Sequence, residues 1–301
     1  MKLICPVCGV PAADLDQVYE RGCPCKQCGF ILRKTDGIVR ALPPERSAFY
    51  ERFLDDYSTI RNAEGRGSTD PEYYRALPYQ DLSGKNSDQW RIRACTYRYF
   101  ESNLLERSGL DILDIGAGNG WMSHRLTQRG DRPVAVDIFT DALDGLAAGR
   151  KIGTFPAVEA EFDHLPFADG QFDLAVFNCS FHYSTDYRAT LLEAGRCLKP
   201  SGSVVILDTP LYKLPGHGER MRAERHEYFR AKYGFPSDSV ASLEFLHEGQ
   251  LGELSRDLQL RWQIYQPWYG WKWHSRPWKA RMLGRRPPSR FCILKANFLG
   301  R

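Results

Sequence analysis

The sequence lacks long apolar runs, internal repeats and a strong excess of one charge. No stretch of its 301 residues approaches the ~18 apolar residues of a membrane-spanning helix, and residues 1–6 show no apolar core of a secretion signal. The formal net charge of +4 is too small to indicate nucleic-acid binding by itself. Hydrophobic residues make up 43% and charged residues 26%, which excludes a disordered or fibrous chain. We therefore expect a cytoplasmic globular protein of about two domains.

The nine cysteines are placed unevenly, and five of them lie within the first 28 residues. Cys5 and Cys8 form one C-x2-C pair, and Cys25 and Cys28 form a second after 16 intervening residues. This spacing is typical of a tetrahedral structural zinc site. A module of about 40 residues buries too little surface to fold unaided, so the metal would supply folding free energy. Cys23 is a competing ligand, but we favour Cys25, because glycine and an aromatic residue follow its pair as in a zinc knuckle.

Composition divides the chain into three parts. We expect a zinc-ribbon module at 1–45, a connector or lid at 46–90, and an α/β domain at 91–301. In the last part, short apolar runs alternate with amphipathic segments, which predicts a Rossmann-like seven-stranded sheet with parallel pairing and helices on both faces. The predicted strands are 111–115, 133–138, 157–162, 172–179, 203–208, 258–265 and 291–296. The predicted helices are 46–57, 87–107, 121–129, 141–150, 187–198, 219–233 and 242–256.

A glycine-rich turn at 116–120 follows the first predicted strand. Glycines at such a turn let the backbone bend sharply and approach a ligand. Asp137 ends the second strand, 23 residues after Asp114, and its carboxylate could accept hydrogen bonds from both ribose hydroxyls of a nucleoside. The dinucleotide fingerprint needs a small residue where this chain has Trp121. Nicotinamide and flavin dinucleotides are therefore disfavoured.

Five ordered motifs resemble those of class I S-adenosylmethionine-dependent methyltransferases. They are D-I-G-A-G-N-G at 114–120, the acid Asp137, E-F-D-H-L-P-F at 161–167, F-D-L-A-V at 172–176 and L-K-P-S-G-S at 198–203. The resemblance covers about residues 90–265, and this core is similar to quinone-biosynthesis methyltransferases. The first 45 residues resemble the zinc ribbon of rRNA guanine-N1 methyltransferases and the zinc-ribbon activators of tRNA methyltransferases.

The resemblance implies an S-adenosylmethionine site with defined roles. Backbone groups of Gly116 and Gly118 would contact the amino-acid portion, and Asp114 would orient the loop or meet the amine. Asp137 would hold the ribose. Glu161 would accept from the adenine amino group beside the Phe162 backbone N–H, or Asp163 would take that role. The predicted cofactor-binding residues are Asp114, Gly116, Ala117, Gly118, Gly120, Asp137, Ile138, Glu161, Phe162 and Asn178.

The methyl acceptor is expected at the end of the fourth predicted strand. His182 could act there as a general base, with Asn178 and Tyr183 as orienting groups; His182 could equally be a structural histidine. Residues 178–183 at this strand end lack the Asn/Asp-Pro-Pro-aromatic pattern of enzymes that methylate exocyclic amines or amides. We expect transfer to a small-molecule or lipid-like acceptor. The alternatives are an rRNA or tRNA base methyltransferase and a non-catalytic cofactor-binding activator.

The end of the sequence is strongly basic. Residues 269–301 contain nine Lys or Arg and no Asp or Glu, and the rest of the chain has a net charge of −5. A Trp-rich insertion at 266–290 interleaves aromatic and cationic residues. This composition fits RNA, an anionic membrane surface, or a loop whose tryptophans pack on the sheet. The sequence predicts no oligomeric state.

Overall fold

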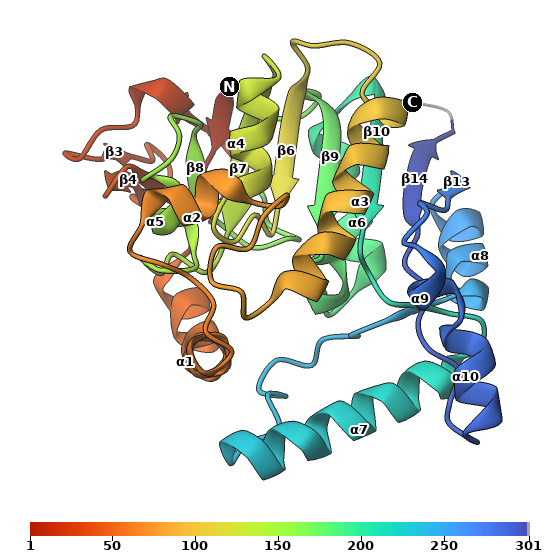
Figure 1. The fold of residues 1–301 in the computed structure, drawn as a ribbon. Helices are drawn as coiled ribbons and strands as arrows, with labels where there is room; N and C mark the ends of the chain where they lie inside the picture. Colours follow the sequence, from red (N-terminus) through yellow and green to blue (C-terminus); the bar gives the residue numbers. More distant parts are fainter. Residues whose placement is uncertain (300–301) are drawn as a thin grey trace.

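The computed structural model describes residues 1–299, so the last two residues of the predicted basic segment lie outside the described part. A sheet of ten strands runs through the molecule (Figure 1), in the order β13-β14-β10-β9-β6-β7-β8-β5-β4-β3. Its seven strands from β13 to β8 are the predicted ones. They span β6 Asp111–Ile115, β7 Arg132–Asp137, β8 Ala157–Glu159, β9 Phe172–Asn178, β10 Leu198–Leu207, β13 Leu260–Tyr265 and β14 Ile293–Phe298.

Two features of the sheet differ from the sequence prediction. β14 runs antiparallel to both β10 and β13, because the connection between the adjacent strands β13 and β14 returns without crossing the sheet. The sheet also continues beyond β8, where β5 Ile38–Arg40 pairs parallel with it, Ile38 opposite Ala157 and Arg40 opposite Glu159. The other pairs from β8 to β10 are parallel, as predicted.

Helices cover both faces of the sheet because neighbouring strand residues point to opposite sides. On one face, Ile112 and Val176 pack with α2 Pro71–Ala76, α3 Ser87–Leu104 and α4 Trp121–Gln128. On the other, Leu113 and Phe177 pack with α6 Tyr187–Cys197 and α8 Glu248–Asp257. Both faces are buried, which explains the nearly continuous apolar strands. Within residues 1–299, no helix is both long enough and apolar enough to cross a membrane.

Some helices depart from their predicted bounds. The predicted helix 141–150 is reduced to α5 Leu146–Gly149, because the Asp141 side chain accepts from the backbone N–H groups of Leu143 and Asp144 and holds a turn instead. The predicted helix 242–256 begins only at Glu248, after β12 Leu246–His247 pairs with β11 Leu211–Tyr212. Conversely, α1 is longer than predicted, at Pro44–Ala63, and α7 spans Pro215–Tyr233.

The N-terminal ribbon shares its core with the α/β part. It consists of β1 Lys2–Ile4, β2 Pro11–Asp14, β3 Cys23–Pro24, β4 Ile31–Thr35 and β5. Leu3 and Leu32 belong to the same buried cluster as Leu113, and Ile4 N–H donates to the carbonyl of Pro166 at 3.1 Å. The division at 1–45, 46–90 and 91–301 stays a prediction, and the first of these parts extends the sheet of the third.

Candidate active site

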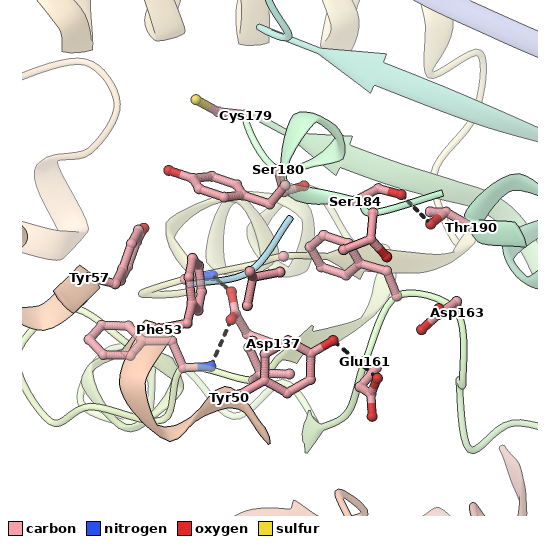
Figure 2. Close-up of a pocket in the computed structure, with 18 residues that line it drawn as sticks. Tyr50, Phe53, Tyr57, Asp137, Glu161, Asp163, Cys179, Ser180, Ser184 and Thr190 are labelled. Carbon is pink, nitrogen blue, oxygen red and sulfur yellow. Dashed lines mark hydrogen bonds between the residues drawn. The ribbon is translucent and has the colours of Figure 1, made fainter. Parts of the chain in front are cut away.

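A pocket lies at the carboxyl ends of β6, β7, β8 and β9, where ligands bind in open α/β sheets. Figure 2 shows its lining, with α1 contributing aromatic rings on one side. Of the predicted cofactor-binding residues, the pocket wall includes Gly116, Gly118, Asp137, Ile138, Glu161 and Phe162. The structure therefore brings together residues that are up to 46 positions apart in the sequence.

The glycine turn is shaped around this pocket. Gly116 has a φ of 74°, and a Cβ atom there would lie 2.2 Å from the Cβ of Ser180, so only glycine fits. Gly118 also has a positive φ, and its N–H donates to Asp137 Oδ2 at 2.7 Å. Asp137 Oδ1 accepts from the N–H of Phe139 at 2.8 Å. Each carboxylate oxygen keeps a further acceptor position for ribose hydroxyls.

Asp137 and Asp114, at the ends of β7 and β6, occupy different environments. Burial raises the pKa of Asp137 to about 6, while its backbone donors oppose that rise. Asp114 lies outside the pocket wall; it is fully buried and accepts from Ser123 Oγ at 2.7 Å. Burial raises the pKa of Asp114 to about 7. Asp114 Oδ1 has no hydrogen-bond partner within the described residues, and its two predicted roles, orientation of the loop and contact with the cofactor amine, stay predictions.

Glu161 is engaged by α1. Arg46 Nε and Nη2 donate to the two Glu161 carboxylate oxygens, each at 2.7 Å, and Tyr50 OH donates to Oε2 at 3.1 Å. Glu161 is only 3% exposed. Asp163 lines the same pocket, is partly exposed, and contacts only His164, at 3.3 Å, among the hydrogen-bond partners within residues 1–299. This geometry favours Asp163 over Glu161 as the group available to an adenine amino group.

The aromatic wall on α1 was not predicted from the sequence. Tyr50, Phe53 and Tyr57 line the pocket, and their spacing of three and four residues places them on one helix face. The aromatic face of this helix could have been predicted from that spacing. An ion pair between Arg61 and Asp144 holds the far end of α1 against the loop after β7. Two other tyrosines of the predicted connector do not line the pocket, because Tyr73 and Tyr74 are buried in the core beside α3.

Of the remaining predicted residues, Tyr183 lines the pocket and the others do not. Ala117 and Gly120 belong to the turn, and Asn178 ends β9 opposite Leu207. His182 lies in a short 3-10 turn, Phe181–Tyr183, and is buried behind Tyr183, with the two ring centroids 4.6 Å apart. Burial and nearby arginines lower the pKa of His182 to about 3, so the ring is neutral at physiological pH. Tyr183 itself lines the pocket.

Comparisons with known proteins agree with this geometry. Residues 113–206 match the family described as a methyltransferase domain. The part of the chain from β6 to β10 therefore resembles a methyltransferase domain. A malonyl-(acyl-carrier protein) O-methyltransferase of Geobacter sulfurreducens is 32% identical over 156 residues, which are 49% of this chain and 51% of that protein. A demethylmenaquinone methyltransferase of Corynebacterium urealyticum is 33% identical over 108 residues, 36% of this chain and 45% of the relative. The chain thus spans about half the length of these relatives.

Solved structures share the fold of the methyltransferase domain. The YcgJ protein of Bacillus subtilis matches 69% of this chain and 99% of its own, with a TM-score of 0.50 and 16% identity. A chain from the complex of the Haloferax volcanii Trm112 methyltransferase activator with a methyltransferase matches 75% of this chain and 96% of its own. Its TM-score is also 0.50, at 16% identity. At these identities the likeness concerns the fold alone.

The cysteine tetrad beside the methyltransferase domain fits a structural zinc. The ligand atoms of Cys5, Cys8, Cys25 and Cys28 lie within 4.8 Å of one another, with Sγ separations of 3.4 Å for Cys5–Cys28 and 3.5 Å for Cys8–Cys25. Four thiolates around one zinc at about 2.3 Å require similar separations. Cys23 Sγ instead contacts the carbonyl of Gln17, which supports Cys25 as the ligand.

The basic insertion has two kinds of aromatic residue. Trp271 is 81% exposed and Trp278 is 64% exposed, in α9 Trp271–His274 and α10 Arg276–Met282, so packing on the sheet does not account for them. Trp273 packs against Tyr269 and Phe291, each at 5.2 Å between ring centroids. Part of the insertion is therefore anchored to the methyltransferase domain, and part presents apolar rings to solvent.

Proposed function

We propose that this protein is an S-adenosylmethionine-dependent methyltransferase that acts on a small-molecule or lipid-like acceptor. The observation that carries the proposal is the pocket at the strand ends, where Gly116 and Gly118 leave backbone room and Asp137 presents a carboxylate. When bound, S-adenosylmethionine supplies an electrophilic methyl group. Proteins named as methylating malonyl-(acyl-carrier protein) and demethylmenaquinone resemble this chain, which supports an acceptor of that kind.

The residues of the chain have separable tasks in this proposal. Asp137 holds the ribose, Asp163 accepts from the adenine, and the α1 face of Tyr50, Phe53 and Tyr57 excludes water from the reacting atoms. Orientation and desolvation account for much of the rate acceleration of such a transfer. Tyr183 orients the acceptor from the pocket wall. His182 packs against Tyr183, and neither His182 nor Asn178 lines the pocket, so neither contacts the acceptor there.

The arrangement of the sheet does not support the alternative function, methylation of an RNA base. The ribbon lies at the β3 end and the basic insertion joins the strands at the opposite end, β13 and β14 (Figure 1). Ten strands spaced about 4.8 Å apart separate the two by roughly 40 Å. One short RNA segment would not contact both surfaces together. The intact pocket likewise argues against a purely non-catalytic activator.

The exposed part of the insertion favours an anionic membrane surface over RNA. Trp271, Trp278 and Met282 expose apolar side chains beside the cations Lys279 and Arg281, as in helices that lie at a membrane interface. A cytoplasmic location, with the cysteines kept reduced for the metal, belongs to the same proposal. Sedimentation with anionic and neutral vesicles tests the surface. Binding to anionic vesicles that Trp271→Ala/Trp278→Ala abolishes would support it, and binding to RNA alone would refute it.

Isothermal titration with S-adenosylmethionine and S-adenosylhomocysteine tests the central proposal. We expect one site per chain, lost in Asp137→Ala and retained in a control variant, Asp238→Ala, of a residue outside the pocket wall. Mass spectrometry of compounds that copurify with the protein should then supply acceptor candidates for transfer of a labelled methyl group. Absence of cofactor binding by the unaltered protein would refute the function.

A further inference from the structure

A second cavity adjoins the cofactor pocket. It lies between α3 and the insertion that contains α9 and α10, and its wall includes Arg93, Asp208, Trp273 and Arg276. Cys179, the residue that follows β9, lines both this cavity and the cofactor pocket. An acceptor bound in the second cavity would therefore reach the first at Cys179.

The second cavity has an excess of positive charge. Its wall carries five cations and two carboxylates, namely Arg91, Arg93, Lys272, Arg276 and Lys279 against Asp88 and Asp208. Asp88 is shared by two of the cations, at 3.3 Å from Arg91 and 3.4 Å from Lys272. Within residues 1–299, neither Arg93 nor Arg276 forms an ion pair with a carboxylate. Two partly buried guanidinium groups thus face the cavity without a direct ion pair, although the Asp208 carboxylate in the same wall lies close enough to attract Arg93.

Both guanidinium groups are held in place by neutral partners. Arg93 lies over the Trp90 ring, 4.7 Å from its centroid, and Nη2 contacts Cys179 Sγ at 3.4 Å. Arg276 lies over the Trp273 ring and donates from Nη2 to the carbonyl of Ser289 at 2.9 Å. Arg276 Nε also donates to the carbonyl of Trp273 at 3.4 Å. Aromatic faces stabilise a cation, and the N–H groups of each guanidinium that are not bonded to these partners remain available to an oxyanion. The side chains are therefore positioned before any ligand binds.

The floor of the cavity carries an independent sign of a ligand site. Asp208 is 2% exposed; its Oδ1 accepts from Thr96 Oγ1 at 2.6 Å, and its buried Oδ2 has no hydrogen-bond partner within the described residues. Thr96 Oγ1 also contacts Tyr269 OH at 2.9 Å, which ties the insertion to this floor. Cys179 and Asp208 have φ values of 57° and 50° although neither is glycine. Such backbone strain gathers at binding and catalytic sites.

We propose that the second cavity binds an acidic group of the methyl acceptor, a carboxylate or a phosphate, between Arg93 and Arg276. The atom that is methylated then lies beside Cys179, where the two cavities meet. Asp208 Oδ2 accepts a hydrogen bond from a hydroxyl or amine of the same acceptor. This inference rests on the proposed function, which it narrows to acceptors with an anionic group.

Alkylation of Cys179 measures the charge of this cavity without knowledge of the acceptor. Iodoacetate is an anion and iodoacetamide is neutral, so the ratio of their rates reports the local potential and cancels changes in thiol reactivity. Peptide mass spectrometry resolves Cys179 from the other cysteines, and Cys23 serves as the internal reference. We expect the ratio at Cys179 to exceed that at Cys23 by at least about threefold. Arg93→Gln or Arg276→Gln should remove most of this difference.

The control variant is Arg98→Gln, since Arg98 lies on the same helix but outside the cavity wall. Protection of Cys179 is then measured in phosphate, acetate or chloride at equal ionic strength. Protection by phosphate alone or by acetate alone supports the proposal and assigns the acidic group. An unchanged ratio in both arginine variants, or no protection beyond chloride, would overturn it. Titration with S-adenosylmethionine checks each variant separately, so failure of the cofactor site is distinguished from failure of the anion site.

Discussion

The identity of the acid that contacts the adenine can be decided by opposite effects of two substitutions. Glu161→Gln removes the charge from a carboxylate that two Arg46 nitrogens contact at 2.7 Å. Loss of one partner from a fully buried ion pair costs about 3–5 kcal/mol. Arg46 is 39% exposed, so water screens part of that loss. We expect the free energy of unfolding to fall by about 1–2 kcal/mol, with little change in cofactor affinity.

Asp163→Ala should show the reverse pattern. Asp163 is partly exposed and has no arginine partner within residues 1–299, so its removal should change the free energy of unfolding by less than about 0.5 kcal/mol. A hydrogen bond from the adenine to this carboxylate in a partly solvated position is worth about 1–1.5 kcal/mol. The dissociation constant for S-adenosylmethionine should therefore rise about five- to tenfold.

Urea unfolding and isothermal titration measure the two quantities on the same variants. Arg46→Gln serves as the matched partner, and the double variant with Glu161→Gln should lose less stability than the two single effects added together. The reasoning fails if Glu161→Gln weakens cofactor binding tenfold at unchanged stability while Asp163→Ala binds normally. In that case Arg46 would release Glu161 to the cofactor, and the original prediction from the sequence would hold.

Three further predictions concern the cofactor turn and the ribbon. Cofactor binding should weaken by up to about tenfold per pH unit as the pH falls below 6. The reason is that Asp137, whose pKa is about 6, becomes protonated and loses its charge as a hydrogen-bond acceptor. Isothermal titration at several pH values measures this effect, and Asp137→Asn should not show it. Gly116→Ala should lower the free energy of unfolding by about 2–5 kcal/mol through its positive φ and its overlap with Ser180, and denaturant unfolding with no loss would contradict this. Metal analysis should find one zinc per chain in Cys23→Ser and much less in Cys25→Ser.

The fold was largely readable from the sequence because its signals are local. The apolar runs from Asp111 to Leu207 and the glycine turn each occupy a few consecutive residues, and the alternation of strands and helices predicts parallel pairing. The order of the strands in the sheet was not predicted. The acids at the strand ends, Asp137 among them, were found because such positions face the ligand in this fold. The Asp141 turn shortened a predicted helix because a side chain competed with the helical backbone.

Contacts between segments that are distant in the sequence could not be predicted from it. Arg46 and Glu161 are 115 residues apart, and no periodicity links them. The second cavity joins Arg93 on α3 to Arg276 in the insertion; the sequence indicated a basic tail, but not which of its cations turn inward. His182 was chosen by its position after a strand, and only the structure shows that it does not line the pocket and that its ring packs against Tyr183.

The attachment of the ribbon to the sheet has a consequence for aggregation. Without the ribbon, β8 would be an outer strand with unpaired N–H and C=O groups, which is a template for pairing between molecules. Here β5 takes that place, and the sheet then ends in β3, a strand of only two residues. A chain whose ribbon has unfolded would expose the edge of β8 beside the cofactor pocket. If a metal holds the ribbon together, we therefore expect loss of that metal to promote self-association through β8.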